Sequence, residues 1–521
     1  MTKEEKRLRR IKNSRNNAVV AVAATTFSGV LSFLERIVFN QCFIADYLGL
    51  YTLFRSIISM LSIVELGIGS AIGYSLYEPI DKGDEEQICA LMNFYKLAYR
   101  IVGLTIFAGS LVVLPFLGFL VNVPFSMTAV RGYFMIFVAR TTIPYFIGHR
   151  EILITANQEK YKTTLVTNIC WSLMYMVQML ISWRTGNFLY YIIAMVCFTT
   201  TRVIVNNIIA IWEFPFLKKH KKAKVAPERM KRVVRNVKGI VISKFGGRLS
   251  AAADAAVISS LVSTAILGCY SNYTLLVKGA HGINKLFPEA ITASLGNAGI
   301  SETKRDLART FQTLNVACFL VYAPITIFLV NVSTPVVATF FGADRILPFR
   351  SVVLVCIAWY LTYQRDIIGT FSSSLGLYWE MRKLPLAEGA LNLVISLILG
   401  RIMGFDGIML GTVISSISIG IVFQPMVIIH HGLRSNAIWY YLSSAGHFIL
   451  TALLCALSLF INSFVPFTGL AEIIIKGLVA AVVPVAILFL FYRKSEEAKI
   501  IIRVLKKAFS KKTRKALKSA L

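Results

Sequence analysis

Ionisable side chains lie inside long apolar stretches of this sequence. Thirteen bases lie in or beside such stretches: Arg36, Arg55, Arg100, Arg131, Arg140, Arg202, Lys244, Arg248, Lys278, Lys285, Arg350, Arg365 and Lys476. The acidic residues of the same stretches are Glu35, Glu65, Asp254, Glu289 and Asp366. If the stretches cross a membrane, each central charge costs about 2.5–3.5 kcal/mol to insert, so it should face a water-filled cavity or an opposite charge. Because the bases outnumber the acids, structural ion pairs alone do not account for them.

The spacing of some of these bases places them on one side of a helix. Lys278 and Lys285 are seven residues apart, and Glu289 follows Lys285 by four, which allows an ion pair. Lys244 and Arg248 are four residues apart and point the same way. Arginine suits phosphate because its planar fork donates paired hydrogen bonds, whereas lysine acts as a point charge. The pattern therefore favours an anionic, phosphate-bearing ligand over an organic cation.

Five bases are our candidates for binding that ligand: Arg36, Arg55, Arg140, Arg248 and Lys278. Four of them would converge on a cationic cavity if the predicted helices 1, 2, 7 and 8 flank the interface between two halves of the protein, namely Arg36, Arg55, Arg248 and Lys278. Arg140 is a candidate because it lies deep in its apolar block. The alternative for any one base is that its long side chain extends to the membrane surface. We favour this alternative for bases near the ends of apolar blocks, namely Arg100, Arg131, Arg350 and Lys476.

The embedded acidic residues admit two interpretations. They could carry a coupling ion, either H⁺ or Na⁺, or they could neutralise neighbouring bases. The candidates are Glu35, Glu65, Asp254 and Asp366. The sequence predicts no cofactor beyond such an ion.

The composition indicates which elements must hold these charges. The chain has 521 residues, of which 56% are hydrophobic and 16% charged, with a mean hydropathy of +0.67. Soluble domains carry about 25% charged residues. Apolar blocks of about 20 residues, the length that crosses a bilayer, lie near 17–39, 48–76, 97–121, 129–149, 164–183, 187–215, 239–262, 265–298, 311–331, 349–375, 384–400, 406–430, 438–461 and 470–492. They predict an all-α polytopic membrane protein with about fourteen transmembrane helices.

The distribution of the 55 Lys and Arg predicts the orientation of these helices. Of these residues, 39 lie in the tails and one set of alternate joints, whereas the other set holds only Arg184, Arg345 and Arg401. Basic joints stay in the cytoplasm. Both termini are therefore expected to be cytoplasmic, and most of the net charge of +29 reports topology.

A weak internal repeat divides the chain. A shift of 219 residues aligns 48–51 with 267–270 and Glu35 with Asp254. Six spans separate the copies, so the repeat is parallel, as in transporters that rock two lobes about a central site. The predicted divisions are a basic cytoplasmic N-tail (1–16), an N-lobe of helices 1–6 (17–215), a basic cytoplasmic linker (216–238), a C-lobe of helices 7–12 (239–430), helices 13–14 (431–492) and a basic amphipathic cytoplasmic tail (493–521).

Other polar features exclude several function classes. The eight cysteines lie mostly inside apolar blocks without CxxC spacing, and the six histidines form no HExxH motif, so we predict neither disulfides nor a metal site. The basic linker is suited to anionic membrane lipids. It has no aromatic residues or reader module beside its charge, so nucleic acid is not an expected partner.

Three stretches of the sequence carry motifs of a known family. The first runs from Leu48 to Phe54 and on through Glu65-Leu66-Gly67-Ile68-Gly69 to Leu76-Tyr77-Glu78-Pro79. The second is Ala156-Asn157-Gln158-Glu159-Lys160-Tyr161, and the third joins Asp254 and Ile258-Ser259 to Leu267-Gly268-Cys269-Tyr270. These stretches resemble bacterial polysaccharide flippases. With its fourteen spans, nearly the whole chain resembles the multidrug/oligosaccharidyl-lipid/polysaccharide exporter superfamily.

The resemblance implies two six-helix lobes, here with two extra helices, that work by alternating access. It implies a transporter, not an enzyme, that flips an isoprenoid-diphosphate-linked oligosaccharide to the outer leaflet of a bacterial cytoplasmic membrane for surface polysaccharide biosynthesis. It further implies that cavity bases bind the diphosphate, a role transferred here to the five candidates. Polysaccharide assembly proteins are expected partners, and we expect a monomer.

Two other functions are consistent with parts of this pattern. A cation-coupled multidrug exporter of the same superfamily would need an acidic, aromatic cavity, which the excess of embedded bases opposes. A membrane-bound sugar ligase or polymerase would place its chemistry on a large external loop. The longest such loop expected here, about 331–348, is short and holds only Asp344 and Arg345 as charges.

Overall fold

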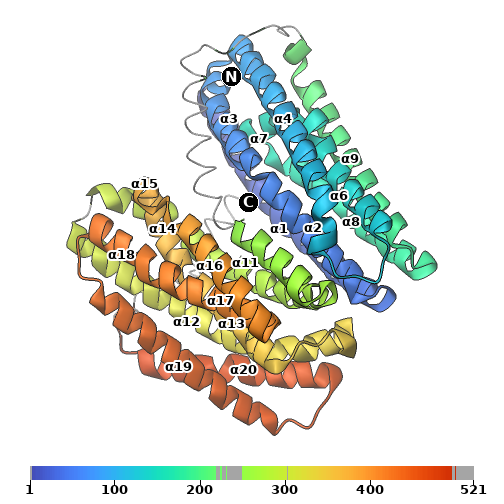
Figure 1. Cartoon of the computed structure of the whole chain (residues 1–521). Coiled ribbons are helices and arrows are strands. Elements are labelled where there is room, and N and C mark those ends of the chain that lie inside the picture. Colours follow the sequence, from blue (N-terminus) through green and yellow to red (C-terminus); the bar gives the residue numbers. More distant parts are fainter. Residues whose placement is uncertain are drawn as a thin grey trace. The chain divides into compact units, whose positions relative to one another are not determined.

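The computed structural model describes residues 3–218, 249–301 and 303–495, together with the single residues 223, 225, 230 and 499. Over this part of the chain it consists of helices and connecting turns, with no strand (Figure 1). Arg248, most of the predicted linker and nearly all of the predicted basic tail lie outside the described residues.

Contacts divide the chain into two compact units, Met1–Ala265 and Ile266–Leu521. The helices of the first unit, blue to green in Figure 1, position the candidate site. They are α1 (Lys3–Cys42), α2 (Ala45–Leu61), α3 (Ile63–Lys82), α4 (Glu85–Val113), α5 (Leu117–Leu120), α6 (Met127–Ile147), α7 (Glu151–Ala156), α8 (Lys160–Thr185), α9 (Phe188–Glu213) and the helical segment Leu249–Val262.

The second unit contains the helices drawn from green to red. They are α11 (Thr264–Ser301), α12 (Lys304–Val336), α13 (Phe349–Gln364), α14 (Asp366–Ser374), α15 (Tyr378–Met381), α16 (Leu384–Met403), α17 (Phe405–Ser415), α18 (Gln424–Val427), α19 (Ile438–Ser463) and α20 (Gly469–Tyr492). Short π-helical turns continue α12 to Phe341 and join α17 to α18.

The predicted all-α polytopic fold is confirmed. Every apolar block coincides with helix over its described residues, and ten helical segments are long and apolar enough to cross a membrane. The block 48–76 is interrupted because the chain breaks at Ser62, between α2 and α3. The predicted extent of the external loop, 331–348, is wrong: the loop is shorter, because helical structure continues through Phe341. The chain is a multi-pass membrane protein.

The contact-based units differ from the predicted lobes in one helix. The segment Leu249–Val262 groups with the first unit, whereas the sequence places it in the C-lobe. The turn after it explains the difference. The Asn122 N–H donates to Thr264 Oγ1 at 3.0 Å, and Gly49 lets the Thr264 carbonyl approach α2 where any Cβ would collide with it. The lobe boundaries themselves stay a prediction.

Side-chain caps define several helix ends. Asp84 accepts a hydrogen bond from Gln87 N at 2.9 Å at the start of α4, and Asn187 accepts one from Leu189 N at 2.9 Å at the start of α9. Such caps satisfy N–H groups that have no partner within the helix. These two caps therefore fix where α4 and α9 begin.

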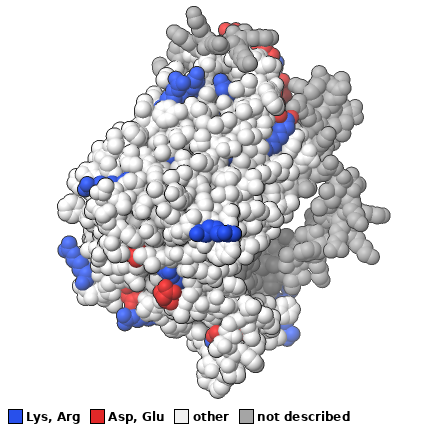
Figure 2. All heavy atoms as spheres, turned by 90° about the vertical axis from the view of Figure 1, so that its right-hand side faces the viewer, with Lys and Arg blue, Asp and Glu red and all other residues white. Residues whose placement is uncertain are grey.

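The outer surface of the helices is apolar. On the face drawn in Figure 2, uncharged side chains cover most of the described surface, and charged side chains occur in scattered places. Large apolar residues are widely exposed, for example Phe119 (80%), Trp212 (79%) and Phe491 (72%). Since exposed apolar surface on this scale is unfavourable in water, these faces are suited to lipid.

A candidate anion-binding cavity in the first unit

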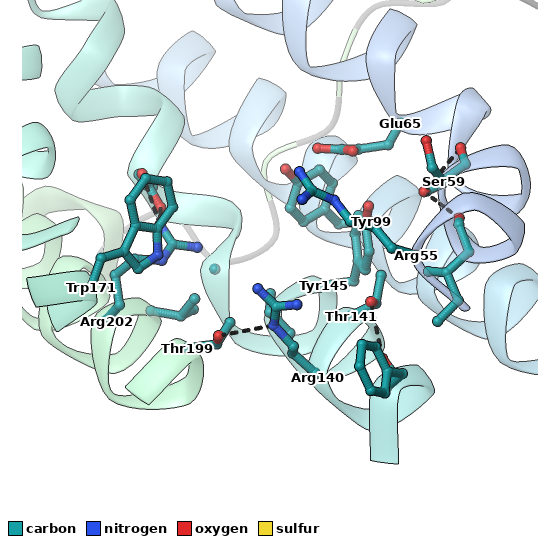
Figure 3. Close-up of a pocket in the computed structure, with 17 residues that line it drawn as sticks. Arg55, Ser59, Glu65, Tyr99, Arg140, Thr141, Tyr145, Trp171, Thr199 and Arg202 are labelled. Carbon is teal, nitrogen blue, oxygen red and sulfur yellow. Dashed lines mark hydrogen bonds and ion pairs between the residues drawn. The ribbon is translucent and has the colours of Figure 1, made fainter. Parts of the chain in front are cut away.

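A cavity of about 390 Å³ lies within the first unit. Its walls come from α2, α3, α4, α6, α7, α8 and α9, so segments far apart in the sequence meet there (Figure 3). Its polar lining comprises Arg55, Ser59, Ser62, Glu65, Tyr99, Arg140, Thr141, Tyr145, Glu151, Thr199 and Arg202. The cavity is therefore a polar space inside a mostly apolar helix bundle.

Interruptions in two helices border this cavity. Ser62 lies at the break between α2 and α3, and its hydroxyl donates to the Ile58 carbonyl at 2.6 Å. Pro144 lies inside α6 and has no N–H to donate to the Arg140 carbonyl one turn earlier. Both residues line the cavity. Irregular backbone is tolerated at membrane depth where it lines a polar cavity.

The charged groups of the cavity differ in their partners. Arg202 Nη1 pairs with Glu151 Oε2 at 3.2 Å, so these two charges compensate each other. Among the described residues, the Arg140 guanidinium makes one long hydrogen bond, from Nε to Thr199 Oγ1 at 3.5 Å. Arg55 is exposed, and its guanidinium makes no hydrogen bond or ion pair with any described residue. Two guanidinium groups thus remain for a ligand.

Glu65 is the remaining acid in the cavity wall, and its carboxylate also makes no ion pair or hydrogen bond within the described ranges. In Figure 3, Arg140 lies between Trp171 and Arg202 on one side and Arg55, Glu65 and Tyr99 on the other. With Arg202 compensated by Glu151, the two remaining guanidinium groups outweigh this one carboxylate. This balance of charge favours an anionic ligand. The Glu65 carboxylate remains available to accept a hydrogen bond from a donor group of that ligand.

A second group of charges surrounds Tyr51, whose ring packs on the cavity-lining Phe137 with centroids 5.4 Å apart. The charges of Arg36, Arg55 and Arg140 all lie close enough to the Tyr51 hydroxyl to act on it, as does that of Glu35. Arg36 is half-buried on α1. The structure therefore brings three of the five predicted bases together within one unit.

Glu35 is buried, with 7% of its surface exposed. Its carboxylate accepts a hydrogen bond from the Tyr191 hydroxyl at 2.6 Å, which joins α1 to α9. The sequence suggested two roles for Glu35, carrying a coupling ion or pairing with a base. Neither role predicted a hydrogen bond from a tyrosine.

The other predicted site residues lie elsewhere. Lys278 is exposed on α11 in the second unit. Asp366 Oδ2 lies 3.5 Å from His281 Nδ1 in the same unit. Asp254 is half-buried in the segment Leu249–Val262, and Arg248 is outside the described residues. Their roles stay predictions.

Several lining residues were not among the predicted site residues. Arg202 was recognised as an embedded base but not as a site residue, although its spacing of three residues from Thr199 puts both on one side of α9. Trp171 and Glu151 also line the cavity. An isolated tryptophan in an apolar block carries no sequence signal that separates a cavity wall from a lipid-facing surface.

The described residues contain no group of three or more His, Cys, Asp or Glu side chains that could hold a metal ion. None of the eight cysteines, all of which lie in the described part of the chain, forms a disulfide. The chemistry of the cavity is therefore that of guanidinium, carboxylate, hydroxyl and aromatic groups.

Comparison with known proteins identifies the fold. No family model matches the sequence, and no curated protein matches it. Among solved structures, the chain resembles the lipid II flippase MurJ in an inward closed conformation, with a TM-score of 0.63 and 15% identity over 91% of this chain and 99% of that one. It also resembles a multidrug resistance MATE family transporter of the MOP superfamily in its inward-facing conformation, with a TM-score of 0.62 and 14% identity over 80% of this chain and 99% of that one.

An outward-facing conformation of a MATE family transporter gives a TM-score of 0.55 at 14% identity, over 83% of this chain and 99% of that one. At such identities the likeness concerns the fold. The fold that the sequence motifs predicted is thus confirmed along almost the whole chain.

Proposed function

We propose that this chain, whose fold is that of the MOP exporters, flips an isoprenoid-diphosphate-linked oligosaccharide from the cytoplasmic to the outer leaflet of a bacterial cytoplasmic membrane. The product would serve surface polysaccharide biosynthesis. The observation that carries the proposal is the pair Arg55 and Arg140, which face one cavity without a carboxylate partner among the described residues.

The charge of the cavity suits a diphosphate. Guanidinium groups donate paired hydrogen bonds to phosphate oxygens, and such charge-assisted bonds are about twice as strong as neutral ones. Placing two bases at membrane depth is costly unless a ligand or water compensates them. A bound diphosphate would provide that compensation, whereas an organic cation would add repulsion.

In this proposal the headgroup enters the polar cavity while the isoprenoid chain stays in the bilayer. Alternating access of the two predicted lobes then exposes the headgroup to the opposite side. One structural neighbour is a lipid II flippase, so proteins of this fold include one that flips a lipid. H⁺ or Na⁺ could drive the cycle, with Glu35, Glu65, Asp254 and Asp366 as the candidate carriers.

The proposal also includes the topology of the protein, its oligomeric state and its partners. Both termini lie in the cytoplasm, and the basic linker and tail contact anionic membrane lipids. The protein acts as a monomer without a cofactor, catalyses no reaction and receives its substrate beside polysaccharide assembly proteins.

The test uses purified protein in proteoliposomes that contain a fluorescent isoprenoid-diphosphate-linked sugar. We expect the wild type to move the lipid between leaflets, measured as fluorescence accessible to an external quencher. Arg55→Ala and Arg140→Ala should each slow this transfer about tenfold or more, since one charge-assisted hydrogen bond is worth about 1.5–3 kcal/mol. Arg184→Ala, at an exposed position at the end of α8, is the control and should leave the rate unchanged.

Two results would contradict the proposal. If Arg55→Ala and Arg140→Ala both transfer the lipid at the wild-type rate, the proposed binding site is wrong. Absence of lipid transfer by the wild type, together with export of a fluorescent organic cation, would favour the multidrug exporter instead.

A further inference from the structure

One aromatic side chain in the cavity wall packs on no other ring among the described residues. Trp171 projects from α8, lines the cavity and is 39% exposed. Within the described ranges it makes no ring contact and its indole N–H donates no hydrogen bond. The other aromatic rings of the wall are covered: Tyr99 packs on Tyr145 with centroids 5.1 Å apart, and Phe137 packs on Tyr51 at 5.4 Å.

Groups that can hydrogen-bond to hydroxyls share the cavity with Trp171. The Thr199 hydroxyl accepts the long bond from Arg140. The Thr141 hydroxyl donates to the Phe137 carbonyl at 3.1 Å, which leaves its oxygen as an acceptor. An ionised Glu65 would offer acceptor positions only. The cavity thus combines cations, neutral hydroxyls, one carboxylate without an ion pair among the described residues and one partly exposed indole ring.

This combination matches a sugar attached to a phosphate. A pyranose ring has a face of C–H groups, whose positive hydrogens are attracted to the negative face of an aromatic ring. Its hydroxyls project from the rim of the ring and donate to carboxylate and hydroxyl oxygens. The phosphate would require the bases.

We propose that Trp171 is the stacking platform for the sugar next to the diphosphate, with Glu65 accepting a hydrogen bond from a hydroxyl of that sugar. Arg55 and Arg140 bind the diphosphate itself. This inference rests on the proposed function, and it assigns sugar recognition mainly to Trp171, which the charge argument does not use.

The size of the cavity limits what is recognised. A volume of about 390 Å³ is near the lower end of the range of about 300–1,000 Å³ for small-molecule sites. It is sufficient for a diphosphate and the first sugar but not for a long oligosaccharide. The cavity therefore selects the sugar at the lipid-linked end, and the remainder of the glycan can vary.

Two alternative roles for Trp171 lead to different expectations. A tryptophan that anchors the protein at the membrane surface would have no effect on ligand affinity. A tryptophan that binds an organic cation through its ring face would lie in an unfavourable field here, because Arg55 and Arg140 line the same cavity without a carboxylate partner among the described residues.

The experiment compares two probes on the full-length protein in nanodiscs. One is a short isoprenyl diphosphate without a sugar, and the other is the same lipid diphosphate linked to one N-acetylhexosamine. Trp171→Ala should raise the Kd of the sugar-bearing probe about fivefold to tenfold, the scale of one aromatic stacking contact. It should leave the Kd of the bare diphosphate within about twofold. Trp171→Phe should retain most of the affinity. Glu65→Gln removes a negative charge beside the diphosphate as well as a strong acceptor, so it should weaken the sugar-bearing probe relative to the bare diphosphate.

Control variants distinguish a failure of the Trp171 proposal from a failure of the flippase proposal. Trp183→Ala removes an exposed tryptophan (72%) from the same helix and should change neither Kd, whereas Arg140→Ala should weaken both probes. If Trp171→Ala affects both probes equally or affects neither, the sugar platform is wrong while the flippase proposal stands. If the wild type binds neither probe, both proposals are wrong.

Discussion

At the scale of the residue, the same side-chain type has different functions depending on its neighbours. Arg202 is compensated by Glu151, and Arg365 in the second unit by Glu388, through contacts of 2.6 and 2.7 Å. Arg55 and Arg140 have no such carboxylate among the described residues. An embedded base without a compensating charge is unstable in apolar surroundings, so these two residues are the ones that a ligand would stabilise.

The buried Glu35 provides a test at this scale. Among the described residues, the Tyr191 hydroxyl is its one hydrogen-bond donor. Tyr191→Phe should therefore destabilise the protein by about 1–3 kcal/mol, the cost of leaving a buried acceptor unsatisfied. The measurement is the melting temperature of the purified protein in detergent. Tyr190→Phe, at the exposed neighbouring position (52%), should have no effect, and equal melting temperatures for all three proteins would contradict the role of this bond.

At the scale of the element, interruptions and close contacts of helices decide where polar space can exist. The break at Ser62 and the proline at 144 border the cavity. Elsewhere the helices approach closely through small residues. On α17, Gly411 packs against Ser396 of α16, whose hydroxyl donates to the Asn392 side chain at 2.9 Å. Small residues are the usual means of close helix packing in membranes because they let dispersion and polar contacts form.

The contact between α16 and α17 yields a prediction. A Cβ at position 411 would lie only 2.8 Å from the Ser396 backbone N, so Gly411→Ala must separate the two helices. We expect a lower yield of folded, monodisperse protein in size-exclusion chromatography. Gly446→Ala on α19 has open space around the added carbon and should behave like the wild type. A wild-type elution profile for Gly411→Ala would contradict this prediction, because it would mean that the two helices can move apart without loss of stability.

At the scale of the whole molecule, charge and hydropathy describe a multi-pass membrane protein whose basic residues are distributed asymmetrically along the chain. The net charge of +29 arises mainly from the tails and the linker, whereas the helices are apolar on their outer faces. Since basic joints remain in the cytoplasm, this asymmetry predicts a single orientation.

Reporter fusions test this orientation. A green fluorescent protein joined after Leu521 should fluoresce, because the C-terminus is expected to be cytoplasmic. Alkaline phosphatase inserted after Gly186, in the turn between α8 and α9, should be active, because that joint holds only Arg184 as a base. The reverse pattern would overturn the predicted topology.

The sequence predicted part of the candidate site. Arg55, Arg140 and Glu65 were expected to be embedded and now share one cavity. Arg202 was noted only as an embedded base, and Trp171 was not noted. The difference has a physical cause: embedding a charge produces a local signal in an apolar block, whereas the side of a helix that faces a cavity depends on the neighbouring helices.

The sequence by itself determined the helical, membrane-spanning character of the protein and the sign of its embedded charge, because hydropathy and charge are properties of single segments. Only the tertiary structure decided which charges have partners: Arg202 pairs with Glu151, while Arg55 and Arg140 face open space beside Trp171. The reason is that ion pairs and cavity walls join side chains from different helices. Arg202 and Glu151, for example, are over 50 residues apart in the sequence, and no local sequence pattern encodes a contact across such a separation.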